Sequence, residues 1–449
     1  MSATTAVGQR LGFIGLQPGV SRLNGITLLY IGLTGIPFMA FINFIQPIIL
    51  EVILGIPRSD QGALTANLAV AQEIILILLV GPFGALSDRI GRRPIIVTGY
   101  LIVGAGFLAY PWATSPLALT LIRAGYAVGA AAIVSSYSTL LADYPVEKSR
   151  GKLIAILGVL NGLGIGLLGF VGGNLPNWLE VAGYEPVLAS RLTMSIVAAI
   201  CMGSALLMIA GLRGGRIGTG HQRQPLGRLL AEGMSAARNP RIAVAYASAF
   251  AARGDVVVIG TYLSLWVTQA GIEQGLSPAE AQGRAGLEFA IVAGAALLIS
   301  PFLGILNDRI DRVRALVIGM AMAALGYLVF GFQSDPLAEF AIFASVLLGI
   351  GQMCSILAGQ TLISQEAEPR IAGSVIGVFS FFGALGTLMG GWVGGQLFGL
   401  WRPGAPFILM GGFNLAVCIA ALWVSTRPGA VTGAAGDDLL ASAAVARRD

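Results

Sequence analysis

Residues 84–93 read GALSDRIGRR, and residues 304–314 read GILNDRIDRVR, at an offset of 220 positions. Each of these charged segments joins two long apolar stretches. Two glycine-rich segments repeat as well, because LLGFVGGNL at 167–175 matches MGGWVGGQL at 389–397, at an offset of 222. Matching segments at nearly one spacing indicate an internal duplication, so the chain is predicted to fold as two similar halves.

The composition predicts that both halves lie in a membrane. Of the 449 residues, 56% are hydrophobic and 11% are charged, whereas soluble domains have about a quarter of their residues charged. Because the apolar runs are continuous rather than alternating, they indicate helices and not a barrel. The predicted fold is an all-α integral membrane protein with two six-helix bundles related by a pseudo-two-fold repeat. Its twelve predicted spans are 24–50, 61–83, 94–113, 116–143, 151–174, 188–212, 241–270, 284–305, 314–333, 337–363, 371–399 and 405–426.

Most of the 27 Lys and Arg residues fall on one side of this topology. The positive-inside rule places that side and both termini in the cytoplasm, so a multi-pass protein of the inner membrane is expected. Basic residues beside anionic headgroups explain the charge of +5 without a nucleic-acid partner. The predicted organisation is an N-terminal bundle at 1–212, a cytoplasmic linker at 213–240 with a short amphipathic helix, a C-terminal bundle at 241–427 and a disordered tail at 428–449.

The charged segment at 84–93 resembles the signature loop of the major facilitator superfamily, which joins the second and third helices of each half. The resemblance implies a monomeric secondary transporter that carries a small molecule by alternating access. In that family the Asp and Arg of the loop latch the two halves in the outward-facing state. Asp143 lies on the same side of the predicted topology and is added to the set. The gating residues that follow are Asp88, Arg89, Arg92, Asp143, Asp308 and Arg309.

Two further patterns of this family are only partly present. Helix five of its drug:proton antiporters carries Gly-Pro-x-x-Gly-Gly, of which residues 168–173 keep only Gly172 and Gly173. Arg123 resembles the helix-four Arg of proton-coupled members, but the Gln-Gly that follows it there is absent. Export by antiport, symport and facilitated transport therefore all stay open.

Charged side chains inside membrane spans are costly and commonly functional. A carboxylate in a medium of low dielectric constant exchanges protons near neutral pH, so Asp255, Glu73 and Glu288 are the candidate proton-coupling residues. Arg253 and Glu288 have similar predicted depths, and an ion pair between them is expected. If Glu288 points elsewhere, Arg253 is available to an anionic substrate.

In this family helices one, four, seven and ten line the central cavity. The polar, charged and aromatic residues of these helices are candidate substrate contacts, with interhelical packing as the alternative role of each. Spacing places Asp255, Tyr262 and Trp266 on one helical face. The candidate substrate-binding residues are Asn43, Gln46, Arg123, Arg253, Tyr262, Trp266, Gln352 and Gln360.

Three functions fit these features. The first is proton-coupled export of a small amphipathic solute, and the second is an organic-anion carrier that uses Arg123 and Arg253. The third is an assembly or sensor protein of the same fold that does not transport. No motif of a zinc protease or a serine nucleophile and no phosphate-binding loop is present in the sequence, so neither an enzyme nor a nucleotide-driven pump is expected. With His221 as the only histidine, no metal site and no cofactor are expected.

Overall fold

The computed structural model describes residues 8–215, 226–368 and 370–426, without the side chains of 226–229 and 308. His221 and the expected tail at 428–449 lie outside the described residues. In the described part, twelve helical segments are long and apolar enough to cross a membrane. This confirms the predicted fold of twelve membrane helices.

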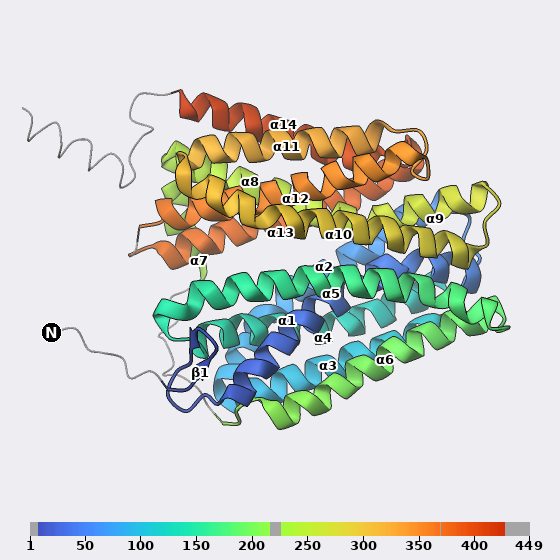
Figure 1. The fold of residues 1–449 in the computed structure, drawn as a ribbon, viewed down its shortest axis with the longest axis horizontal. Coiled ribbons are helices and arrows are strands. Elements are labelled where there is room, and N and C mark those ends of the chain that lie inside the picture. Colours follow the sequence, from blue (N-terminus) through green and yellow to red (C-terminus); the bar gives the residue numbers. More distant parts are fainter. Residues whose placement is uncertain (1–7, 216–225, 369, 427–449) are drawn as a thin grey trace, which may run out of the picture.

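The N-terminal half contains the first six spans, drawn in blue to green in Figure 1. The first span ends in a π-helical segment, and the third ends in a short 3-10 turn. The elements of this half are α1 (Arg22–Ile48), η1 (Ile49–Ile53), α2 (Arg58–Ile90), α3 (Arg92–Ala109), η2 (Tyr110–Trp112), α4 (Pro116–Asp143), α5 (Glu147–Val181) and α6 (Pro186–Gly211).

The C-terminal half follows a short helix in the segment between the halves, α7 (Leu226–Ser235), and a 3-10 turn, η3 (Ala236–Arg238). Its first span is again interrupted by a π-helical segment. The remaining elements are α8 (Pro240–Val258), η4 (Ile259–Leu263), α9 (Ser264–Glu273), α10 (Pro278–Arg309), α11 (Arg312–Phe332), α12 (Glu339–Glu366), α13 (Ala372–Leu400) and α14 (Ala405–Ser425).

Local capping explains why one helix begins earlier than its apolar run. α10 was predicted to begin at 284 but begins at Pro278. The Ser277 side chain accepts a hydrogen bond from the Glu280 backbone N–H, and the Glu280 side chain accepts one from the Ser277 N–H. This capping box, with proline in the first helical position, starts the helix in polar sequence that hydropathy does not count.

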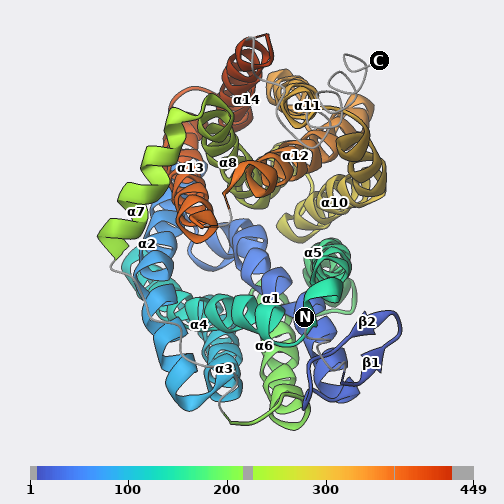
Figure 2. The ribbon, with the colours of Figure 1, turned by 90° about the vertical axis from the view of Figure 1, so that its left-hand side faces the viewer.

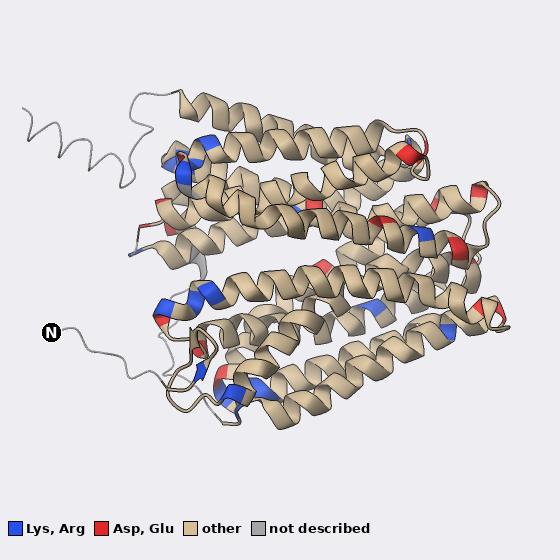
Figure 3. Ribbon diagram, in the orientation of Figure 1, with Lys and Arg blue, Asp and Glu red and all other residues tan. Residues whose placement is uncertain are grey.

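Lys and Arg gather at one end of the long axis, on the left in Figure 3. We call this the basic end. The α2–α3, α4–α5 and α10–α11 turns lie there, and so do the start of α1 and the end of α14 (Figure 1). Viewed along the long axis in Figure 2, the two halves meet along two seams, α2 against α13 and α5 against α10.

The two seams bring backbones of different halves into close contact away from the basic end. A Cβ atom on Gly62 of α2 would lie 3.0 Å from the Gly395 oxygen of α13. A Cβ on Gly286 of α10 would lie 2.9 Å from the Gly169 oxygen of α5. Glycine at these positions therefore permits an approach that any side chain would prevent.

Hydrogen bonds between the halves lie at the same end as these contacts. The Phe44 carbonyl of α1 accepts from Ser264 Oγ at 2.6 Å and from Gln282 Nε2 at 3.1 Å. Gln269 Nε2 of α9 donates to Gln61 Oε1 of α2 at 3.0 Å. We call this the sealed end, because buried amides and hydroxyls here join the two halves directly.

A small hairpin precedes the first span and was not predicted from the sequence. Its strands, β1 (Arg10–Leu11) and β2 (Ile14–Gly15), pair antiparallel. The hairpin lies on the α4–α5 turn, where Val146 N donates to the Gly15 carbonyl at 3.0 Å and Gly15 N donates to Ser149 Oγ at 2.9 Å. These bonds fix the start of the described chain to the N-terminal half.

Candidate functional site

The signature loop forms a compact charge network at the basic end. Arg92, at the start of α3, is 7% exposed. Its Nε donates to Asp143 Oδ2 at 3.1 Å, and its Nη1 donates to Ser87 Oγ at 3.2 Å and to the Asp88 carboxylate. Asp88, Arg92 and Asp143 are thus brought together from the ends of three helices. The fourth gating candidate of this half, Arg89, follows Asp88 at the exposed end of α2.

The C-terminal half builds its network from different residues. Arg241, 5% exposed, donates from Nη2 to Asp311 Oδ2 at 2.9 Å and pairs through Nε with Glu366 Oε1 at 2.8 Å. The gating pair expected here was Asp308 and Arg309. The side chain of Asp308 lies outside the described residues, and Arg309 is exposed. The network described in this half therefore centres on Arg241, which sequence reasoning missed.

One sequence difference between the two copies of the loop accompanies the different network of the C-terminal half. Asp311 occupies the place that Gly91 has in the first copy, at the offset of 220. In α11 the Asp311 side chain caps the helix by accepting from Val313 N at 3.0 Å and Arg314 N at 3.2 Å. A glycine cannot supply that cap, so Asp311 adds to this turn an acidic group that the first copy lacks at the corresponding position.

We expect Asp88→Asn to lower transport several-fold at equal protein amount. The change removes the charge of the Asp88 carboxylate that Arg92 contacts, and Arg92 keeps its ion pair with Asp143. Flux in proteoliposomes, normalised to reconstituted protein, measures the effect. Asp60→Asn, which alters an exposed acid at the sealed end, serves as the matched control. Full activity of Asp88→Asn would exclude a gating role for this residue.

Three of the predicted substrate contacts gather inside the N-terminal half. Arg123 is fully buried, and its guanidinium donates to Gln72 Oε1 at 2.8 Å, Gln46 Oε1 at 3.1 Å, Tyr110 Oη at 3.3 Å and the Asn43 side chain. These acceptors come from α1, α2 and η2, and all are neutral. Arg123 therefore ties helices of one half together and is not exposed to a substrate in this state.

The helical face that carries Asp255, Tyr262 and Trp266 packs inside the C-terminal half. Asp255 is fully buried and accepts from Asn414 Nδ2 at 2.9 Å and Ser355 Oγ at 3.0 Å. Tyr262 donates to the Gly391 carbonyl, and Trp266 packs edge-on against Phe330 in α11. Asp255, Tyr262 and Trp266 are all buried in contacts with neighbouring helices in this state, and their place in a central cavity stays a prediction.

Arg253 lies two positions before Asp255 on α8 and is exposed. The expected ion pair with Glu288 is not formed in this part of the described chain. Glu288 instead lies buried between α10 and α12 and accepts from Ser345 Oγ at 2.6 Å. The stem of Arg253 packs on α13, where a Cβ on Gly383 would lie 2.8 Å from its Cγ.

The charge of Arg253 acts on a residue of the other half. Glu73, partly exposed on α2, lies within electrostatic range of the Arg253 guanidinium. Glu73 lies on α2 and Arg253 lies on α8, and α13 packs against both of these helices. The two side chains form no hydrogen bond or ion pair in the described structure. We call them the interhalf charges. Of the remaining candidates, Gln352 is partly exposed and Gln360 exposed on α12, which packs against α8.

Comparison with known proteins assigns the family. The sequence model of the Major Facilitator Superfamily matches residues 27–281 and, a second time, residues 246–439. The chain belongs to the Major Facilitator Superfamily. Together the two matches cover most of the chain, and the twelve spans agree with a multi-pass membrane protein.

Individual relatives of this superfamily member differ in their descriptions. The magnetosome protein MamH of Paramagnetospirillum magneticum is 29% identical, with 89% of this chain and 93% of MamH covered. The magnetosome protein MamZ of Magnetospirillum gryphiswaldense is 28% identical, with 85% of this chain but 59% of MamZ covered. The multidrug resistance protein MdtH of Aeromonas salmonicida is 26% identical, with 69% of this chain and 71% of MdtH covered.

The fold is also similar to that of a solved transporter. The nucleoside transporter NupG aligns with a TM-score of 0.68 at 14% identity, covering 90% of this chain and 100% of NupG. At this identity the likeness concerns the fold alone.

Proposed function

We propose that this superfamily member is a secondary active transporter for small organic anions, coupled to protons through Glu73. The observation that carries the proposal is Arg253, an exposed guanidinium at mid-depth whose expected partner Glu288 is bonded to Ser345 instead. An arginine inside a membrane protein without a bonded carboxylate is costly. An anionic substrate would offset that cost when it binds.

Glu73 supplies the coupling in this proposal. When Glu73 is ionised, its charge attracts Arg253 and competes with an anion for the guanidinium. A proton on Glu73 removes this competition, so proton and anion favour the same state of the protein. Such positive coupling of two ligands favours moving them in the same direction.

The structure then represents one state of an alternating-access cycle. The positive-inside rule assigns the basic end to the cytoplasm. The hydrogen bonds at the sealed end would close the path to the other side of the inner membrane, so the state is inward-facing. The networks around Arg92 and Arg241 lie at the basic end of the helices. These helix ends would approach each other when the protein changes from the inward-facing to the outward-facing state.

Uptake into proteoliposomes with an imposed pH gradient tests this function. We expect accumulation of anionic solutes, but not of cationic ones, from a panel of matched size. Glu73→Gln should keep downhill anion flux and lose the accumulation driven by the gradient. Asp60→Asn, which changes an exposed carboxylate at the sealed end outside the candidate coupling residues, is the control. If gradient-driven accumulation is undiminished in Glu73→Gln, the proton-coupling residue is Asp255 or Glu288 instead.

Export of amphipathic solutes is the second candidate, supported by the similarity to the multidrug resistance protein MdtH. In that case a cationic solute and a proton would compete for Glu73, and the same assay would give gradient-driven efflux of cations. The absence of flux for every solute class would support the third function, an assembly or sensor protein.

A further inference from the structure

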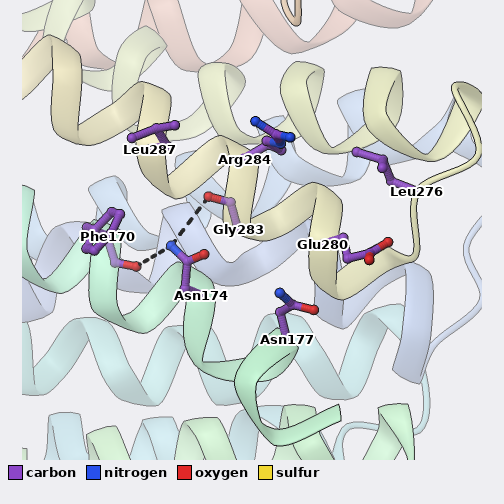
Figure 4. A pocket seen from close by; sticks show the side chains of 8 residues that line it. All are labelled: Phe170, Asn174, Asn177, Leu276, Glu280, Gly283, Arg284 and Leu287. Atoms are coloured by element: carbon purple, nitrogen blue, oxygen red, sulfur yellow. Dashed lines mark hydrogen bonds between the residues drawn. The ribbon is translucent and has the colours of Figure 1, made fainter. Parts of the chain in front are cut away.

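A cavity of about 330 Å³ lies between α5 and α10, where the seam of the two halves reaches the sealed end. Figure 4 shows its polar lining: Asn174 and Asn177 come from α5, and Glu280 and Arg284 come from α10. Asn174 Nδ2 donates to the Phe170 carbonyl at 2.8 Å and to the Gly283 carbonyl at 3.5 Å, so its oxygen keeps its acceptor sites open. The cavity is therefore built from both halves and is lined by amides and charges.

The charged side chains around the cavity form no ion pair within the described residues, and the Glu280 carboxylate accepts a hydrogen bond from the Ser277 N–H at the start of its own helix. Arg284 is exposed, and its guanidinium forms no hydrogen bond or ion pair in the described part of the chain. Glu180 of α5 lies within electrostatic range of Glu280, and its buried Oε1 has no hydrogen-bond partner in the described structure. One guanidinium and two carboxylates leave this region with a net negative charge. A ligand that carries both a cation and an anion complements it.

Apolar stripes lead from the cavity toward the middle of the membrane. On α5, Phe170, Leu167 and Leu163 follow Asn174 at helical spacing and are 39%, 60% and 47% exposed. On α10, Leu287 and Leu298 follow Arg284 on one face and are 40% and 75% exposed. Residues three or four apart, and residues eleven apart at 3.6 residues per turn, share a helix face, so these side chains continue the polar lining with a hydrocarbon surface.

The depth of the cavity matches the headgroup region of a bilayer. It lies in the last turns of α5, which ends at Val181, and the first turns of α10, which begins at Pro278. Trp178, in the last turn of α5, and Tyr184, in the turn that follows it, are 47% and 45% exposed. Tryptophan and tyrosine are enriched where membrane proteins meet the headgroups.

We propose that this cavity binds the headgroup of an ethanolamine glycerophospholipid from the leaflet at the sealed end. The phosphate lies on Arg284, the ammonium lies near Glu280 and Glu180, and the acyl chains follow the stripes on α5 and α10. Because its two walls belong to different halves, the bound lipid stabilises the state in which this end is sealed. The proposal is independent of the transported solute.

Native mass spectrometry of the full-length protein tests the site. The probes are phosphatidylethanolamine, phosphatidylcholine and phosphatidylglycerol with identical acyl chains. We expect the wild type to retain the ethanolamine lipid preferentially. Because Arg284→Gln removes one charge-assisted contact, it should weaken this retention about tenfold. Arg284→Lys should keep most of it, and Arg191→Gln, which removes a cation of α6 at the same end, should change nothing.

Three results would overturn the proposal. Equal retention of the three lipids would mean a nonspecific lipid shell, and stronger retention of phosphatidylglycerol would mean a simple anion site. Binding of free phosphoethanolamine as tight as that of the whole lipid would assign the cavity to a soluble ligand. Thermal unfolding of each variant without added lipid is the control. A variant that unfolds at the wild-type temperature but retains less lipid has lost the binding site and not the fold.

Discussion

The double variant Ala69→Cys, Gly391→Cys is expected to lose at least nine-tenths of its transport under oxidising conditions and to recover it on reduction. A Cβ on Gly391 of α13 would lie 3.8 Å from the Cβ of Ala69 on α2. This is about the separation that a disulfide requires. The two positions belong to different halves, so the bond would hold together a seam that has to part in an alternating-access cycle.

Flux in proteoliposomes with and without reductant measures the effect, and each single cysteine variant is a control. Native Cys201 and Cys354 are buried and stay in place. A cross-linked protein that transports at the full rate would show that α2 and α13 do not separate here during the cycle.

Arg253→Gln is expected to lower anion transport by about tenfold to a hundredfold. A hydrogen bond to a charged group contributes about 1.5–3 kcal/mol, and each 1.4 kcal/mol corresponds to about a factor of ten. Arg253→Lys keeps the charge and should keep part of the flux. Uptake of a panel of carboxylates and phosphates at equal protein amount gives the measurement, with Arg238→Gln, which changes an exposed arginine of η3 outside the candidate sets, as the matched control.

The same variant tests the partner of Arg253. Because Glu288 is bonded to Ser345 and not to Arg253, adding Glu288→Gln should restore neither flux nor thermal stability. Recovery of stability in the double variant would mean that the two residues pair. The anion proposal would then lose its main support.

Hydropathy determines much of this fold, and periodicity determines part of the site. Helical geometry correctly separates Arg253 from Asp255, because two positions correspond to about 200° around a helix. It does not say which neighbour each side chain meets. Depth along the helix favoured Glu288 for Arg253, whereas the packing of α2 against α13 brings Glu73 within range from the other half.

The burial of polar residues shows a second limit of the sequence. Asn43, Gln46 and Arg123 are three of the eight predicted substrate-binding residues, and the structure brings these three together. Their network also contains Gln72 and Tyr110, which carry no local signal of their own. Such residues can line a substrate path or hold helices together. Which of the two they do depends on how each helix is rotated about its axis, and contacts between segments far apart in the sequence set that rotation.

Because the β1–β2 hairpin is bonded to the N-terminal half, the distance from the hairpin to the end of α14 reports how far the two halves separate. Its hydrogen bonds to Gly15 tie the beginning of the chain to one half, while α14 carries the other end on the opposite half (Figure 1). Phe13 at the hairpin tip is 68% exposed, and Thr426 after α14 is exposed as well. Spin labels at these two positions would report, through a single distance distribution, how the population of states responds to pH, solute or lipid.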